Sequence, residues 1–122
     1  MPRKNVLASF HAIKNGDMSS VITSPVTNVM FLDNLIIQLN STGAPVGAYT
    51  VEFSADYSQD SQGVVINPGN WVVCGLSPSA SITSAGSVMI DFNQVPASYM
   101  RVTWTPSSGT GVLNMYVAAK EI

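Results

Sequence analysis

Residues 48–56 read AYTVEFSAD, and this stretch decides the fold class. Odd-numbered positions carry tyrosine, valine, phenylalanine and alanine, whereas the even-numbered positions between them carry threonine, glutamate and serine. Because successive side chains of a β-strand point to opposite faces of a sheet, this period of two predicts a strand with one face turned toward a core. The apolar face consists of Tyr49, Val51, Phe53 and Ala55.

The rest of the chain repeats this pattern in short β-prone runs separated by turn residues. Further runs are predicted at residues 5–13, 19–23, 29–40, 64–66, 71–74, 87–92, 100–105 and 113–119. The glycines and prolines fall almost entirely between the runs, where they favour turns. With about eight strands and no helical pattern, residues 1–122 are predicted to form a single all-β domain, a two-layer antiparallel β-sandwich of jelly-roll-like type.

The C-terminal runs at 100–105 and 113–119 are predicted to pair as a hairpin. Each has one apolar face, and the PSSGTG between them supplies a glycine-containing turn. Arg101 lies on the polar face of its run, where we expect it to pair with Asp91 or Glu52.

The composition narrows the classes of partner. Only 10% of the 122 residues are charged, against about a quarter in typical soluble domains. A polar surface with so little charge suits contact with other subunits or neutral ligands. Five Lys and Arg residues and a net charge of −2 argue against nucleic acid, whose phosphates are bound mainly by these side chains.

The chain is also expected to lack membrane segments and disulfides. The densest apolar stretch, residues 29–39, is interrupted by polar side chains and is too short to span a bilayer. No apolar leader of signal-peptide length begins the sequence. Cys74 is the only cysteine, so an intrachain disulfide is impossible, and a buried inert thiol in a reducing cytosol is expected.

The N-terminal segment allows two interpretations. Arg3 and Lys4 form a small basic start, which either contacts an acidic neighbour or is a solvated tail. Because a turn at Asn15–Asp17 separates the first run from the second, residues 1–10 are a candidate arm that grips an adjacent subunit.

The sequence contains few residues that could form a catalytic or metal-binding site. His11 is the only histidine, which leaves no histidine-based metal cluster, and we expect it at an edge or on the surface. Asp56 and Asp60 flank a polar loop whose oxygens could bind Ca²⁺, but the dedicated calcium-loop pattern is absent, and a solvated loop is favoured. The sequence therefore predicts no catalytic residues, no cofactor and no metal.

Three aromatic residues are candidates for contact with a partner. Tyr57 and Tyr116 are expected to be exposed, because tyrosine offers rigid amphipathic area. Trp71 follows the turn residues 68–70 and is expected to be partly exposed, either as core or as a sugar-stacking platform.

Several motifs resemble those of a known group. They are YTVEFSAD at 49–56, a strand at Trp71, VPASYMRV at 95–102 and SSGTGVLN at 107–114. The chain resembles small β-sandwich virion proteins of tailed bacteriophages, in which a V-x-F-S-x-D strand precedes a tryptophan, and P-A-S-Y-x-R-V leads to S-G-T-G-x-L-N. The first 30 residues do not match this pattern.

The resemblance implies a capsid decoration, head-fibre or tail-associated protein without enzymatic activity. It also implies a homo-oligomer, often a trimer, that contacts viral capsid or tail proteins in a virion assembled in the host cytoplasm. The alternative is a carbohydrate- or receptor-binding module with a glycan as ligand. A glycan binder needs Trp71 or a tyrosine pair exposed around a shallow groove, whereas a decoration protein needs an apolar patch at a face or edge.

Overall fold

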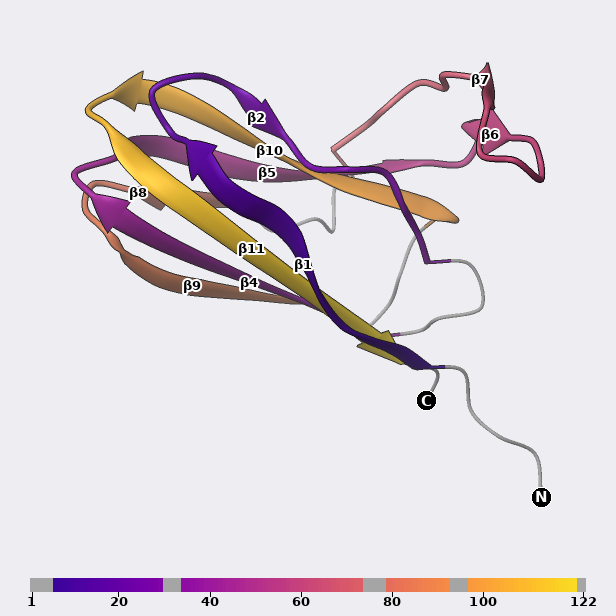
Figure 1. Cartoon of the computed structure of the whole chain (residues 1–122), viewed down its shortest axis with the longest axis horizontal. Coiled ribbons are helices and arrows are strands. Elements are labelled where there is room, and N and C mark those ends of the chain that lie inside the picture. Colours follow the sequence, from indigo (N-terminus) through magenta and orange to yellow (C-terminus); the bar gives the residue numbers. More distant parts are fainter. Residues whose placement is uncertain (1–5, 30–33, 74–78, 93–96, 121–122) are drawn as a thin grey trace.

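The computed structural model describes residues 6–29, 34–73, 79–92 and 97–120, and every regular element among them is a β-strand (Figure 1). The strands are β1 (Val6–Asp17), β2 (Ile22–Thr23), β3 (Thr27–Asn28), β4 (Asn34–Gly43), β5 (Val46–Ser54), β6 (Ser58–Gln59), β7 (Val65–Asn67), β8 (Ser79–Ile82), β9 (Gly86–Phe92), β10 (Tyr99–Ser108) and β11 (Gly111–Lys120). Within the described ranges, no helix is long and apolar enough to cross a bilayer.

Two antiparallel sheets form the sandwich. The first has the strand order β1-β11-β4-β9, and the second has the order β2-β10-β5-β8, with β3 also paired to β10. Counting β2 and β3 as one interrupted edge strand leaves eight sandwich strands, because β6 and β7 pair only with each other. This strand order is that of a jelly roll, so the predicted fold class is confirmed.

The interruption between β2 and β3 has a local cause. Pro25 lacks a backbone N–H and therefore cannot continue a strand ladder. The buried Ser24 makes up for this break, because its hydroxyl accepts a hydrogen bond from the Val102 amide at 2.8 Å, and its own amide donates to the Val102 carbonyl at 2.8 Å.

The predicted C-terminal hairpin is wrong. β10 pairs with β5, and β11 pairs with β4 and β1, so consecutive strands lie in opposite sheets. The turn between them packs against the β4–β5 corner, where the Ala44 amide donates to the Thr110 carbonyl at 2.8 Å. At Gly109, φ is +78°, and a side chain there would collide with the Ala44 carbonyl. A two-strand alternation cannot reveal whether the chain turns within a sheet or crosses to the other.

The core lies between the sheets and follows the period-2 pattern. Its buried members are Ile13, Met18, Val29, Leu35, Ile37, Leu39, Tyr49, Val51, Phe53, Ile90, Phe92, Met100, Val102, Trp104, Leu113, Met115 and Val117. Ala55 is an exception to the inward face expected for the run 48–56. β5 ends at Ser54, whose side chain is buried instead, and Ala55 is exposed.

Trp104 links the layers. Its side chain is 1% exposed, and its indole N–H donates to the Met18 carbonyl at 2.9 Å. The Met18 amide in turn donates to the Gly111 carbonyl at 2.9 Å, which belongs to the opposite sheet. Burial beside Trp104 also raises the pKa of the Tyr49 phenol, because the charged form is desolvated.

Two expected boundaries are corrected by the pairing. Residues 6–10 of the candidate arm form the first part of β1, which pairs with β11 from Val6↔Lys120 onward. The rest of the candidate arm, residues 1–5, lies outside the described residues. The run predicted at 71–74 is a single bridge between Val72 and Phe53, and Cys74 lies outside the described residues.

Replacement of Gly47 by alanine should destabilise the fold. A Cβ at this position would overlap the Thr105 carbonyl and lie 2.7 Å from the Trp104 ring, and neither neighbour can retreat easily. We expect a loss of about 3 kcal/mol, the upper end for overpacking, measured by urea denaturation. The control is Gly63→Ala, which has open space and a φ of +86°, and should cost only about 1 kcal/mol. Equal losses would contradict the packing of Trp104 on Gly47.

Candidate functional site

The long connection between β5 and β8 differs from the others. Except at this connection, the sandwich chain crosses to the opposite sheet after each strand, whereas β5 and β8 pair within one sheet. The described part of the connection, residues 55–73, is called the excursion here. It carries the β6–β7 hairpin, which projects beyond the sheets at the end where β1 begins and β11 ends (Figure 1).

Trp71 docks the excursion on the second sheet. The guanidinium carbon of Arg101 lies 4.5 Å from the centroid of the indole, within cation–π range. The ring of Tyr57 lies 5.7 Å away in a tilted arrangement, and the indole N–H donates to the Pro68 carbonyl at 3.1 Å. Trp71 is half-buried, so it meets the expectation of partial exposure, but its neighbours belong to the protein itself.

Arg101 is positioned by the neighbouring strand. Its guanidinium lies 3.3 Å from a carboxylate oxygen of Glu52, the partner directly opposite in β5. The other oxygen of that carboxylate accepts a hydrogen bond of 2.6 Å from the Thr103 hydroxyl. The expected pair with Glu52 is confirmed, whereas Asp91 lies in the other sheet. A partly exposed pair of this kind contributes at most about 1 kcal/mol, so its main effect is to orient the guanidinium over Trp71.

Tyr57 is buried, so its expected exposure is wrong. Only 9% of its surface is accessible, and its ring meets Tyr99 edge-on at 4.9 Å. The burial depends on Gly69, where φ is +73° and an added Cβ would lie 2.9 Å from the Tyr57 backbone. The returning chain therefore covers Tyr57, a long-range contact that the local sequence does not encode.

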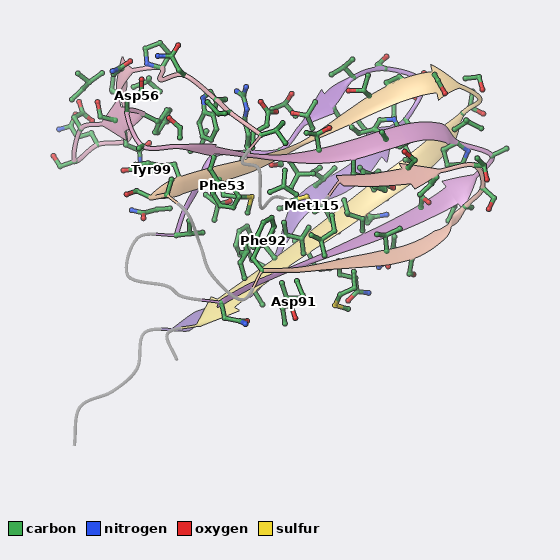
Figure 2. All side chains as sticks on the ribbon, turned by 180° about the vertical axis from the view of Figure 1, so that it is seen from behind. Phe53, Asp56, Asp91, Phe92, Tyr99 and Met115 are labelled. Atoms are coloured by element: carbon green, nitrogen blue, oxygen red, sulfur yellow. The ribbon has the colours of Figure 1, made fainter. Side chains whose placement is uncertain are left out.

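Asp56 holds the two ends of the β6–β7 segment together by hydrogen bonds. Figure 2 shows it at the end of the sandwich opposite the β4–β5 turn. One carboxylate oxygen accepts hydrogen bonds from the Ser54 hydroxyl and the Asn70 amide, both at 2.8 Å. The other accepts from the Asn70 side chain at 2.8 Å. The Asn70 amide, followed by Ser54 and the Asn70 side chain, lowers the pKa of Asp56 below 3.8.

Asp60 has a similar role within the β6–β7 turn. Its carboxylate accepts from the amides of Gln62 and Val64, each at 2.9 Å. The loop considered as a calcium site therefore uses its acids to bind its own backbone. Among the described residues, no group of three or more His, Cys, Asp or Glu side chains is placed to bind a metal.

The excursion also presents apolar side chains to solvent. We call residues 58–67, the β6–β7 hairpin, the apolar arm. Exposed apolar side chains of the excursion are Val64 (60%), Val65 (49%), Ile66 (69%), Val72 (61%) and Val73 (47%). The sequence marked 64–66 as a short strand but not as a surface. The sequence signal for an exposed apolar surface is the run of three consecutive β-branched residues, because one strand cannot turn all three side chains toward a core.

Tyr116 lies elsewhere, on the first sheet. It is half-buried rather than exposed as expected, and it stacks on the His11 ring with centroids 4.4 Å apart. A nitrogen of His11 lies 2.9 Å from the Asn114 side-chain oxygen, which also accepts from the Asn15 amide at 3.0 Å. His11 is on the edge strand β1, as expected, and its described partners are an amide and an aromatic ring.

The remaining predicted contact residues, Arg3 and Lys4, lie outside the described residues. The structure thus brings Tyr57 and Trp71 together and places Tyr116 on a different sheet. A pocket of about 300 Å³ lies near the turn between β8 and β9, where hydroxyls of Ser41, Thr83 and Ser84 line it. It is at the opposite end of the sandwich from the excursion.

The comparisons with known proteins give a likeness in fold. No protein-family model and no curated protein sequence matches the chain. Among solved structures, the chain is similar to the SPBc2 prophage-derived protein YomS, with a TM-score of 0.52 and 11% sequence identity. The match covers 97% of this chain and 96% of that one, so the two share an architecture from end to end.

Truncation of Trp71 should release the excursion while the sandwich stays folded. The Val72 amide donates to the Phe53 carbonyl at 3.1 Å, next to the stacked tryptophan. In Trp71→Ala we expect the Val72 amide to lose its hydrogen-exchange protection. Local opening of the excursion would then no longer have to break the contacts of Trp71 with Arg101 and Tyr57, so it would cost less free energy. Amides of β10 and β11 should keep theirs. Val73→Ala is the control, and unchanged protection of Val72 in Trp71→Ala would contradict this docking.

Acid should loosen the excursion. Since the pKa of Asp56 is lowered on folding, its stabilisation is complete above about pH 4 and is lost as pH falls through the lowered pKa. The Asn70 amide resonance should therefore titrate with a midpoint below 3.8, followed by NMR. In Asp56→Asn this titration should disappear. A midpoint at or above 3.8 would show that the hydrogen bonds do not favour the carboxylate.

Proposed function

We propose that this chain is a non-enzymatic structural protein of a bacteriophage virion, which associates with its own copies and with the viral shell through the apolar arm. The observation that carries the proposal is the arm itself: three consecutive large apolar side chains are exposed on a hairpin that stands away from the sandwich. Its place of action would be the virion, after assembly in the host cytoplasm.

The fold is compatible with this role. Jelly rolls are the common architecture of viral capsid domains, and they also occur in lectins. The end-to-end likeness to a prophage-derived protein supports a phage origin, although at 11% identity it concerns the fold alone. The low charge and the motif resemblance of the sequence favour the same class.

The apolar arm has the energetics of a contact surface. Full burial of one valine or isoleucine contributes roughly 1.5–3 kcal/mol. Arms from neighbouring copies would thus offset much of the association cost of roughly 4–15 kcal/mol. The nearby side chains of Val72 and Val73, in the same excursion, add to the exposed apolar area.

The glycan-binding alternative has less support. A sugar platform needs an open aromatic face, but Arg101 lies over Trp71, and Tyr57 is 9% exposed. The pocket between β8 and β9 is lined by hydroxyl, small and aliphatic side chains and by no aromatic ring. In the described part of the chain, no catalytic constellation favours an enzyme, and His11 contacts Asn114 and Tyr116.

Replacing the apolar arm should remove the self-association made through the arm. We expect the wild-type chain to be oligomeric by size-exclusion chromatography with light scattering, with a trimer as the proposed state of the contact made through the arm. The double variant Val65→Ser/Ile66→Ser should lose the oligomer made through the arm, should be no larger than a dimer and should stay fully folded, because both side chains are exposed in the single chain. Val21→Ser is the matched control, since Val21 is 61% exposed but lies between β1 and β2, on the end of the sandwich away from the excursion.

The virion assignment has its own test. Mass spectrometry of particles purified from the strain that encodes the chain should find it in stoichiometric amounts with the capsid or tail proteins. A monomeric wild-type chain that binds a glycan array at micromolar concentration and is absent from particles would contradict the proposal and favour the alternative.

A further inference from the structure

The four edges of the sandwich are not alike. β1 pairs with β11 through register shifts at three places, and the β2–β3 edge is broken at Pro25. β8 has only four residues. Bulges, prolines and short strands are the devices by which natural sheets prevent pairing at their edges.

β9 carries none of these devices. Its seven residues pair with β4 one for one, without a register shift, from Leu35↔Phe92 to Ser41↔Gly86. It contains neither proline nor lysine, and among the described strands only β4 pairs with it. Within residues 6–29, 34–73, 79–92 and 97–120, no strand therefore pairs with its outer edge.

The side chains of β9 are compatible with pairing at this edge. Ile90 and Phe92 are buried in the sandwich, and Val88 is half-buried at its margin. On the outer face Met89 is 60% exposed, between Ser87 and Asp91. Figure 2 shows Phe92 directed inward and Asp91 directed away from the core.

We propose that β9 pairs antiparallel with β9 of a second copy of this chain across a two-fold axis at Met89. The two four-stranded sheets would then continue as one, a form of β-augmentation with identical partners. This surface is separate from the apolar arm, and the inference stands apart from the proposed function.

The register follows from overlap and charge. With Met89 opposite Met89 of the second copy, all seven residues pair, and each inward side chain faces another inward one. Asp91 then faces Ser87, a hydroxyl donor, rather than a second carboxylate. A register shifted toward the C-terminal end of β9 would bring the two Asp91 carboxylates together, which is unfavourable for directly opposite like charges.

Disulfide trapping tests the register in a Cys74→Ser background. Directly opposite residues of antiparallel strands have Cα atoms about 4.5–5.5 Å apart, within disulfide reach. Met89→Cys should therefore give a covalent dimer under mild oxidation. Gln38→Cys, on the same face but one strand inward, would place its thiols about 14 Å apart at the usual strand spacing and should not. Asp91→Cys alone should fail, whereas Ser87→Cys/Asp91→Cys should succeed.

The expected result is a dimer that forms at least about tenfold faster for Met89→Cys than for the two single controls. Equal rates, or no dimer, would overturn the proposal. As a second measurement without thiols, Met89→Lys should remove the contact and Gln38→Lys should retain it by light scattering. If Val65→Ser/Ile66→Ser still allows the Met89→Cys dimer, the β9 contact survives failure of the arm. If the Met89→Cys dimer does not form while association through the arm remains, the β9 proposal fails and the proposed function stands.

Discussion

The rest of the structure depends on a chain of hydrogen bonds that connects the two sheets. The Trp104 indole donates to Met18, and the Met18 amide donates to Gly111, so a strand of the second sheet is joined to a strand of the first through the β1–β2 corner. Around this link the chain crosses from sheet to sheet at almost every turn. The crossings place all the inward faces in one core. They also require glycine where corners meet, as at Gly109.

The exception to these crossings explains where the exposed apolar hairpin arises. Because β5 and β8 lie in one sheet, their connection need not wrap around the core, and it can extend outward. Trp71, Tyr57 and Arg101 attach its base to the sandwich, while its acids bind its own backbone. The hairpin beyond this base has no core of its own, so its valines and isoleucine remain in solvent.

The sequence predicted the sandwich and its inward faces, because alternation is local and strong in runs such as 48–54 and 113–117. It could not predict which strands pair. The alternation of residues 100–105 and 113–119 is the same whether they form a hairpin or lie in opposite sheets. Tyr57 shows the same limit at a site, since its burial is created by Gly69, which returns after the hairpin. The Arg101–Glu52 pair was within reach, because a cation and an anion on outward positions have few other partners.

The sandwich therefore has a closed core, and the proposed contact surface lies on the hairpin outside it. Hydrogen exchange read by mass spectrometry, compared between dilute and concentrated protein, tests this most directly. It should show slow exchange throughout β4, β5, β10 and β11 at both concentrations, and fast exchange of residues 58–67 that slows only on association. Fast exchange of the strands, or no change in residues 58–67 while other segments become protected, would contradict it.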